Sequence, residues 1–253
     1  MRSPLCYVGG KSRLAKHIAS VIPEHDSYCE VFAGAGWVFF AKEPSRYEIL
    51  NDISSDLISF WRVVQNHLEE FFRQFRYLLV SREWFEDYKR QAEAGGLTYV
   101  QKAARFYYLQ RCGFGGKMVG RVFGTNPVRL PRINLLRLEE ELSAVHLRLA
   151  TVTIEHLPYG EFIARYDRAG TCFYLDPPYW GCENFYGDNF SADDFPRLAA
   201  ALAGICGKFI LSINDVPEIR DIFKAFTIAT VPTAYSMQSR AYKRVTELLI
   251  RNF

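Results

Sequence analysis

Strand-like and helix-like segments alternate along this chain, and no other feature limits its fold so strongly. Short apolar segments with strand character occur at Ser27–Phe32, Tyr47–Leu50, Thr151–Ile154, Cys172–Asp176, Lys208–Ile213 and Val245–Arg251. Segments with helical spacing lie between the later strands, at about Ala192–Ile205 and Val216–Ala225. Such alternation predicts an α/β fold in which a doubly wound, mostly parallel sheet carries helices on both faces.

The chain between about residues 55 and 150 contains no strand of this series. Helical periodicity instead occupies Ile53 to about Leu79, Ser81–Ala94, Thr98–Cys112 and Asn134–Ala150. Gly113–Gly124 holds five glycines in twelve residues, which predicts a mobile loop. We therefore expect residues 1–55 and 150–253 to form the sheet domain, with residues 56–149 as a helical insert.

The insert carries a basic block. Between Ala94 and Leu138, a span of 45 residues, there is no Asp or Glu, and the span holds eight cations: Lys102, Arg105, Arg111, Lys117, Arg121, Arg129, Arg132 and Arg137. The net charge of the chain is +3, so the remainder sums to 3 − 8 = −5. This asymmetry predicts a segment that binds double-stranded DNA. The alternative, a solvated helix face plus a loop, would usually mix both signs. The cations expected on DNA are Arg111, Lys117, Arg121, Arg129 and Arg132.

The composition excludes several classes of protein. With 49% apolar and 23% charged residues, the chain has the balance of a soluble globular protein. Its 15% aromatic residues are incompatible with intrinsic disorder. No apolar run approaches the roughly 18 residues of a membrane span, and the N-terminus lacks the apolar stretch of a signal peptide. An intracellular protein is the expectation.

The cysteines and histidines form no metal-binding pattern. The six cysteines stand at positions 6, 29, 112, 172, 182 and 206, without a C-x-x-C pair or a nearby histidine in zinc spacing. The five histidines are equally scattered. We therefore expect no metal site and interpret the cysteines as reduced, small core residues.

A glycine turn follows the first predicted strand, in the segment Phe32-Ala33-Gly34-Ala35-Gly36. Asp52 comes 18 residues after Gly34, at the end of the next strand, where an acid can accept hydrogen bonds from both hydroxyls of a ribose. A dinucleotide site would place a third glycine where this chain has Phe39. The turn is therefore predicted to bind an adenosine without a pyrophosphate. A second glycine segment, Tyr7-Val8-Gly9-Gly10-Lys11, is ambiguous alone, since an ordinary surface turn before a helix would look the same.

Asp176-Pro177-Pro178-Tyr179 ends the predicted strand CFYLD. The Asp176 carboxylate and the Pro177 carbonyl are two acceptors that can grip the two hydrogens of an exocyclic amine. Proline stiffens the turn and removes a backbone donor, while Tyr179 offers a flat face to a base. A proline-stiffened strand exit would explain neither the aspartate nor the tyrosine.

Together these segments resemble the Dam-like DNA adenine-specific methyltransferases, which use S-adenosylmethionine. YVGGK resembles the N-terminal cofactor motif of that family, EVFAGAGWVFF its glycine motif, ILNDISSDLISFW the stretch that follows, and LDPPY its catalytic motif. The order also matches, with a target-recognition insert before LDPPY. The resemblance is strong over residues 6–61 and 171–190, moderate over 208–251 and poor across the insert.

The resemblance implies a Rossmann-like class I methyltransferase fold and methyl transfer from S-adenosylmethionine to the 6-amino group of an adenine flipped out of DNA. It implies a catalytic site formed by Asp176, Pro177, Pro178 and Tyr179. Cofactor contacts are implied for Tyr7, Lys11, Glu30, Phe32, Gly34, Gly36, Asp52, Asp176 and Glu155. It implies no metal, membrane or obligatory protein partner, and a cytoplasmic location in a bacterial or phage-encoded protein.

Three other functions remain open at this point. The methyl acceptor could be a cytosine amine, an RNA adenine or a protein amide, although Asp176 at the head of the motif favours adenine by resemblance. A nicotinamide oxidoreductase conflicts with Phe39 and with the DPPY turn. A non-catalytic DNA-binding protein conflicts with the intact set of DPPY, Asp52 and Lys11.

Overall fold

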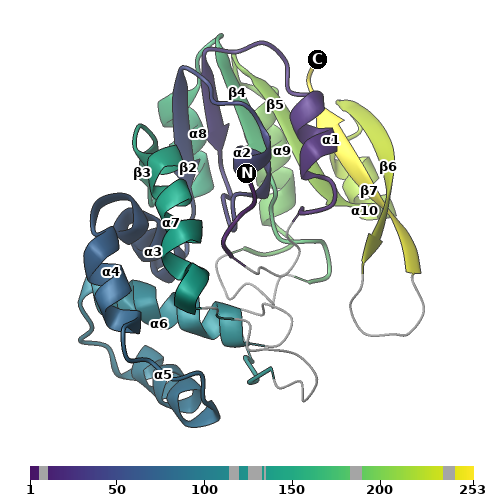
Figure 1. Cartoon of the computed structure of the whole chain (residues 1–253). Helices are drawn as coiled ribbons and strands as arrows, with labels where there is room; N and C mark the ends of the chain where they lie inside the picture. Colours follow the sequence, from purple (N-terminus) through teal and green to yellow (C-terminus); the bar gives the residue numbers. More distant parts are fainter. Residues whose placement is uncertain (6–10, 114–119, 125–132, 134, 183–189, 236–242) are drawn as a thin grey trace.

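Seven strands form a single sheet in the computed structural model, which describes residues 1–5, 11–113, 120–124, 133, 135–182, 190–235 and 243–253 (Figure 1). The strands are β1 Ser27–Glu30, β2 Tyr47–Asn51, β3 Thr153–Glu155, β4 Thr171–Leu175, β5 Lys208–Asn214, β6 Thr227–Tyr235 and β7 Lys243–Arg251. Their order across the sheet is β3-β2-β1-β4-β5-β7-β6. Strands β1 to β5 pair in parallel, and β7 runs antiparallel between β5 and β6. The predicted Rossmann-like α/β fold, a doubly wound and mostly parallel sheet with helices, is confirmed.

Three elements are absent from the sequence prediction. Strand β6 lies at the sheet edge, where Pro232 is tolerated because its missing N–H need not pair with a further strand. Helix α2, Trp37–Ala41, has five residues and α8, Tyr159–Tyr166, has eight. All five residues of α2, WVFFA, are apolar, so no alternation of apolar and polar residues marks it as a helix.

Helices cover both faces of the sheet. The others are α1 Ala15–Ser20, α3 Ser55–Asn66, α4 Leu68–Phe75, α5 Arg82–Ala94, α6 Tyr99–Cys112, α7 Leu135–Leu149, α9 Asp194–Ala203 and α10 Pro217–Ile222. Buried side chains of α1, α2, α3 and α7 pack on one face, and those of α8, α9 and α10 on the other. Among the described residues, no helix combines the length and apolar character needed to cross a membrane.

Side-chain alternation along the strands separates the two cores. In β1, Tyr28 belongs to the core beneath α1 and α2, whereas Cys29 belongs to the core beneath α8 and α9. The same alternation places Ser212 of β5 and Glu247 of β7 on the Tyr28 side, because Ile210 and Leu249, two residues away in each strand, belong to that core. This face of the sheet therefore carries polar side chains among its apolar ones.

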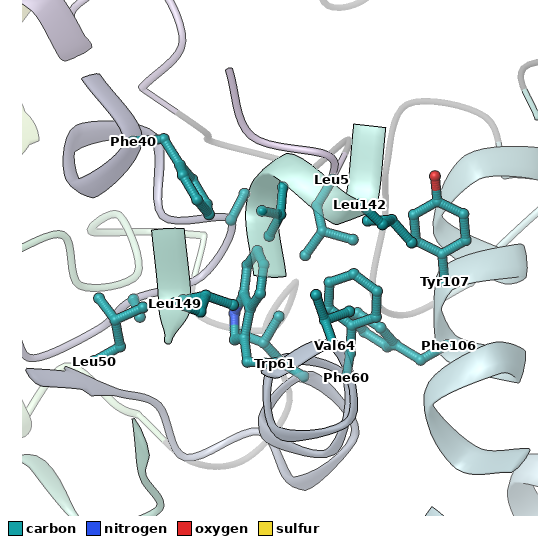
Figure 2. Packing of buried hydrophobic residues seen from close by; sticks show 14 of the residues in the cluster. Leu5, Phe40, Leu50, Phe60, Trp61, Val64, Phe106, Tyr107, Leu142 and Leu149 are labelled. Carbon is teal, nitrogen blue, oxygen red and sulfur yellow. The ribbon is translucent and has the colours of Figure 1, made fainter. Parts of the chain in front are cut away.

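Helices α3 to α7 follow one another in the chain between β2 and β3, and this helical segment has one more break than expected. The single helix expected from Ile53 to about Leu79 is wrong: α3 and α4 are separated at His67, whose φ of −138° and ψ of 40° are not helical. Trp61 of α3 packs between Phe40 of α2 and Phe60, with ring centroids 5.7 and 4.9 Å away (Figure 2). The core beneath the sheet thus continues without interruption into these helices.

The cysteines only partly match the prediction. Cys29, Cys112 and Cys172 are buried, as expected of small core residues. Cys182 is half-buried and Cys206 is exposed, so the core interpretation is wrong for Cys206. Cys206 follows α9 in the turn that leads into β5, where its backbone N–H, rather than its thiol, is held by the Asp167 carboxylate.

Candidate active site

The carboxyl ends of β1, β2 and β4 bring the predicted site residues to one edge of the sheet. Glu30, the last residue of β1, lies in register with Leu50 of β2 and Tyr174 of β4. Asp52 follows β2 directly, and Asp176 follows β4 directly. Ligands of open parallel sheets bind at this edge. The glycine turn, Asp52 and the DPPY turn, which are far apart in the sequence, are therefore neighbours in the fold.

The glycine turn is fixed by Asp52 and Trp61. Gly34 and Gly36 have φ values of +49° and +65°, a region that favours glycine, and a Cβ at Gly36 would approach the Phe40 ring to 3.2 Å. The Gly34 N–H donates to Asp52 Oδ2 at 2.9 Å, and the Trp61 indole N–H donates to the Gly34 carbonyl at 3.2 Å. The conformation of the glycine turn is thus fixed by hydrogen bonds with Asp52, which follows β2, and with Trp61 of α3.

Asp52 is held equally firmly. Its Oδ1 accepts the Ser54 N–H at 2.8 Å while Oδ2 accepts that of Gly34. Burial raises the pKa of Asp52 above its ordinary value, and the two N–H donors oppose this by stabilising the carboxylate. Each carboxylate oxygen keeps a second lone pair, so the fixed carboxylate can still accept hydrogen bonds from a ligand.

Glu155 ends β3 beside the end of β2, in register with Asn51. Its carboxylate accepts the Tyr166 hydroxyl at 2.7 Å. The buried Asn51 amide donates to the carbonyls of Val31 and Leu157, at 3.0 Å each. Asn51 therefore ties the ends of β1, β2 and β3 together and brings Glu155 and Asp52 to adjacent strand ends.

Glu30 is a buried carboxyl group with two donors. It is 1% exposed and accepts the Tyr28 hydroxyl at 2.8 Å as well as the backbone N–H of Phe39 in α2. Burial raises the pKa of Glu30 to about 8, because desolvation outweighs the stabilisation from these donors. Phe39, the bulky residue at the third glycine position, thus contributes its backbone to the site and its ring to the core.

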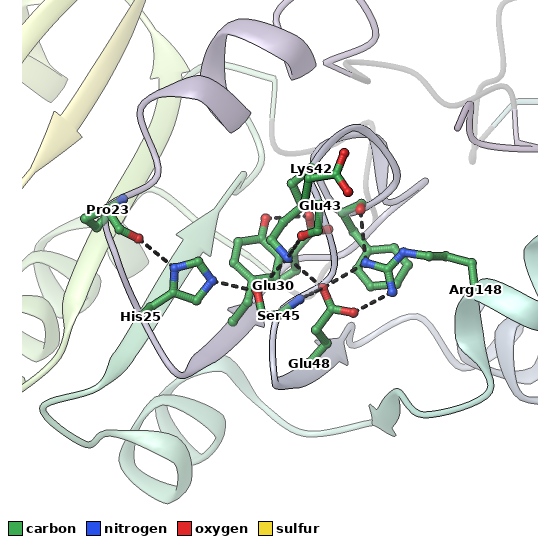
Figure 3. Close-up of polar contacts among 10 residues, drawn as sticks. Pro23, His25, Glu30, Lys42, Glu43, Ser45, Glu48 and Arg148 are labelled. Carbon is green, nitrogen blue, oxygen red and sulfur yellow. Dashed lines mark hydrogen bonds and ion pairs between the residues drawn. The ribbon is translucent and has the colours of Figure 1, made fainter.

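A buried ion-pair network supports both donors to Glu30 (Figure 3). Lys42 donates to Glu48 Oε1 at 2.6 Å and lies 4.4 Å from the centroid of the Tyr28 ring. Arg148, near the end of α7, makes two hydrogen bonds to Glu48, and its guanidinium carbon lies 3.8 Å from the centroid of the Phe39 ring. Helix α7 is thereby joined to β2 and α2.

Phe32 lies in an aromatic cluster on the other side of the sheet. Its ring centroid is 5.8 Å from those of Tyr159 and Phe190. This cluster adjoins the core beneath α8 and α9. Phe32 therefore offers an apolar surface beside the glycine turn rather than a polar contact.

The DPPY turn is bound to Lys11 and to β7. Lys11 is 3% exposed, and its Nζ donates to Asp176 Oδ1 at 2.5 Å and to the Tyr179 hydroxyl at 2.9 Å. The same Nζ lies 2.8 Å from Glu247 Oε1, which also accepts the Tyr179 hydroxyl at 3.0 Å. Lys11 of the predicted YVGGK motif is therefore in direct contact with the DPPY turn.

The turn itself is rigid. Pro177 and Pro178 are buried. The Asn214 side chain accepts the backbone N–H of Trp180 at 3.0 Å and donates to its carbonyl at 3.1 Å. The Trp180 ring packs against Phe195 of α9 with ring centroids 5.2 Å apart. The positions of Asp176 and Tyr179 are thus fixed from both sides.

The charge state of Asp176 depends on opposing effects. Burial raises its pKa to about 6, the Lys11 ammonium lowers it, and the Glu247 carboxylate raises it. Ser212 Oγ lies 3.5 Å from Asp176 Oδ1, and Ser212 is in turn bonded to the Tyr174 hydroxyl at 2.8 Å. Both of these side-chain contacts reach Oδ1 of the Asp176 carboxylate.

Several site residues escape prediction from the sequence. Asn51, Ser212, Asn214 and Glu247 each make hydrogen bonds that position a predicted residue or its strand end. Three of them lie in two strand segments: Ser212 and Asn214 in KFILSIND, and Glu247 in VTELLI. The sequence marks each of them only as a polar residue among apolar neighbours. Tyr7, a predicted cofactor contact, lies outside the described residues.

The basic block is only partly available to a ligand. Arg105 is 4% exposed and pairs with Asp56 at 2.6 Å, and Lys102 lies 3.5 Å from the same carboxylate. Arg111 donates to the Pro4 carbonyl at 3.2 Å, while the guanidinium of Arg121 lies 5.7 Å from the Phe106 ring centroid. The other three cations predicted on DNA, Lys117, Arg129 and Arg132, lie outside the described residues. So do residues 114–119 of the predicted mobile loop Gly113–Gly124.

Comparison with known proteins decides the family. Residues 7–237 match the D12 class N6 adenine-specific DNA methyltransferases. The chain belongs to this family. It is 28% identical to the DNA adenine methylase of Escherichia coli K12 over 264 residues, covering 98% of this chain and 94% of that protein. A Type II methyltransferase of Lactococcus lactis subsp. cremoris, M1.LlaDCHI, is 25% identical over 274 residues, at 98% and 94% coverage.

Solved structures of other methyltransferases have lower sequence identity to this D12 family member than these two relatives have. A putative RNA methyltransferase of Pyrococcus horikoshii superposes with a TM-score of 0.40 and 11% identity, over 95% of this chain and 79% of that one. The family assignment identifies the chain as an enzyme and its reaction as adenine methylation in DNA. The alternatives of a nicotinamide oxidoreductase, a non-catalytic DNA-binding protein and a different methyl acceptor are not favoured.

Proposed function

We propose that this D12 methyltransferase moves a methyl group from S-adenosylmethionine to the 6-amino group of an adenine extruded from duplex DNA, with Asp176 and the Pro177 carbonyl holding the amine. One observation supports this most directly. Asp176 forms an ion pair with Lys11 and follows β4 directly. Strand β4 pairs with β1, and the carboxyl end of β1 leads into the glycine turn. An amine held at Asp176 would therefore lie beside a ligand held at that turn.

The strand ends fit the parts of S-adenosylmethionine. Gly34 and Gly36 add no side chain to the turn, and Asp52 presents a fixed acceptor suited to ribose hydroxyls. Glu155 lies at the adjacent strand end, where an acceptor suits an adenine amine. Glu30, Phe32 and Lys11 would line the methionine side. The bound cofactor supplies an electrophilic methyl group on a positively charged sulfonium.

Asp176 would act on the amine through its charge and position. The lone pair of an adenine amine is conjugated with the ring, and two acceptors on its hydrogens favour a more nucleophilic, pyramidal nitrogen. Positive charge develops on this nitrogen as the new C–N bond forms and the C–S bond of the sulfonium breaks. A preorganised carboxylate stabilises this charge until the amine releases one proton to water. With a pKa of about 6, Asp176 is ionised at neutral pH and above.

DNA binding would fall to the helical insert, residues 56–149. An amine within a stacked duplex cannot enter a site at the sheet edge, so the adenine must be flipped out. Phosphate contacts from the insert would hold the duplex beside that edge. Arg148 links the insert to Glu48 and Phe39, which gives the two parts a fixed relative position.

A nucleoside analysis tests the proposal. Unmethylated duplex DNA is incubated with the protein and labelled S-adenosylmethionine, digested, and its nucleosides separated. We expect the label in N6-methyladenine. Label in a methylated cytosine, or in RNA but not DNA offered together, would contradict the proposal.

Asp52→Ala is expected to weaken S-adenosylmethionine binding by roughly 10- to 100-fold, the range for losing hydrogen bonds to a charged acceptor. The turn would also loosen, because Gly34 and Ser54 lose their shared acceptor. DNA affinity should stay unchanged. Calorimetry measures both affinities, with exposed Glu43→Ala as the matched control. Equal cofactor affinity in the two variants would place the ribose contact elsewhere.

Tyr179→Ala should lose a base–aromatic stack of about 1–3 kcal/mol and most of the activity. Tyr179→Phe keeps the ring but loses the hydroxyl contacts with Lys11 and Glu247, so it should keep part of the activity. A fluorescent adenine analogue at the target position reports unstacking from DNA. If Tyr179→Ala matches wild type in both fluorescence and rate, another aromatic such as Trp180 holds the base.

Neutralising Arg111, Lys117 and Arg121 should weaken binding to all DNA sequences together. Each lost phosphate contact reduces the slope of log affinity against log salt by about 0.9. Binding curves at several salt concentrations measure the slope. Neutralising the exposed Arg90 and Lys224, which lie outside the basic block, serves as the control. An unaltered slope in the triple variant would exclude these cations as phosphate contacts.

A further inference from the structure

The antiparallel strand β7 delivers a carboxylate to the DPPY turn. Glu247 lies opposite Asn214 of β5, and its side chain is 1% exposed. Its Oε1 is 2.8 Å from Lys11 Nζ and 3.0 Å from the Tyr179 hydroxyl. Burying a carboxylate is costly unless it is paired and hydrogen-bonded, so these contacts are required by its position.

We propose that Glu247 is a positioning residue for methyl transfer: it holds the Lys11 ammonium and the Tyr179 hydroxyl, and thereby leaves Asp176 able to accept the target amine. This inference rests on the proposed function of Asp176 and Tyr179. An ammonium group has three N–H donors, and the Asp176, Tyr179 and Glu247 oxygens are three acceptors for it. Lys11 is therefore shared between two carboxylates rather than committed to one.

The sharing changes the charge of the site. With all three groups ionised, Asp176, Glu247 and Lys11 sum to −1. Positive charge that develops on the amine nitrogen is stabilised by this net negative charge. Without the Glu247 charge the sum becomes zero, and the Lys11 ammonium becomes the counter-ion of Asp176 alone. The amine would then compete with Lys11 for the Asp176 carboxylate, which alone keeps a negative charge among these three groups.

Glu247 also affects the pH at which Asp176 ionises. The groups that act on the Asp176 carboxyl come from five segments: Lys11 before α1, Glu30 of β1, Tyr174 of β4, Ser212 of β5 and Glu247 of β7. Among these, the Glu247 charge raises the pKa of Asp176, and Lys11 lowers it. Removing the Glu247 charge should therefore lower the pKa of Asp176.

The test compares Glu247→Gln, which keeps the size and an acceptor oxygen but loses the charge, with Glu247→Asp, which keeps the charge. Thr246→Val is the matched control, because Thr246 is exposed on the same strand and contacts Asp215 instead. Methylation is measured against pH at saturating cofactor. In the unloaded protein, the Asp176 carboxyl carbon is titrated by NMR. Thermal unfolding and DNA binding check that each variant folds.

We expect Glu247→Gln to lower kcat by up to about 100-fold, the effect of misplacing a reacting group, and to shift the acid limb and the Asp176 titration to lower pH. Glu247→Asp should keep the acid limb of wild type, and Thr246→Val should match wild type throughout. Wild-type kcat and titration in Glu247→Gln would overturn the proposal, as would a fall in kcat with no titration shift.

If Asp176→Ala is inactive while Glu247→Gln behaves as wild type, only this inference fails. Wild-type methylation by Asp176→Ala would instead reject the proposed function.

Discussion

Asp176→Ala is expected to lower the rate of methyl transfer by about 100-fold or more, the typical cost of removing a preorganised partner of the transition state. Only the Pro177 carbonyl would remain as an acceptor for the amine. The fold should persist, because Lys11 keeps its contacts with Glu247 and Tyr179. Single-turnover methylation of a short duplex measures the rate without interference from product release.

Two controls make this result specific. Asp221→Ala removes a carboxylate that is 78% exposed on α10, and it should methylate at the wild-type rate. DNA binding by Asp176→Ala should match wild type, since the insert is untouched. A variant rate within a few-fold of wild type would show that Asp176 does not hold the amine.

Lys11→Met should produce the largest loss of stability. Lys11 is 2% exposed in its side chain and pairs with both Asp176 and Glu247, so its loss leaves the buried Glu247 carboxylate and the half-buried Asp176 carboxylate without the cation between them. Breaking a buried pair by removing one partner costs about 3–5 kcal/mol of unfolding free energy. Denaturant unfolding measures this loss, and Lys16→Met, an exposed position in α1, is the matched control.

The pH dependence of Lys11→Met follows from the same contacts. Lys11 lowers the pKa of Asp176, so in the variant that pKa rises above its wild-type value of about 6. A carboxyl group whose pKa is raised in the folded state binds more protons there than in the unfolded state. The unfolding free energy of the protein therefore falls as pH rises. The deficit should therefore be larger at about pH 8 than at about pH 5. Equal deficits at both values would argue against Asp176 as the strained partner.

The sheet could be predicted because its central strands are largely buried. Strands such as β4 and β5 are short apolar runs between turns, and the sequence marks them directly. Strand β6 lies at the edge and contains Pro232, so burial imposes no such pattern on it. The break at His67 was missed because α3 and α4 both keep apolar residues at helical spacing, and a one-residue interruption hardly disturbs that pattern.

The site was predictable where chemistry requires an unusual local sequence. DPPY, the glycine turn and Asp52 stand out without a structure. Glu247 and Ser212 do not, because a single polar residue in a strand becomes meaningful only when the pairing of β5 with β7 places it beside Lys11. The basic block misled in one respect: Arg105 belongs to a buried pair with Asp56, 49 residues away in sequence.

Single-molecule sequencing of methylated DNA tests the central claim most directly. Plasmid DNA from a host without adenine methylation is incubated with S-adenosylmethionine and either wild-type protein or Asp176→Ala. We expect N6-methyladenine in the wild-type sample, at sites whose shared sequence defines the recognition context, and almost none in the Asp176→Ala sample. Methylated cytosines in place of adenines, or equal adenine methylation in both samples, would contradict the assignment of Asp176 and the DPPY turn to the target adenine.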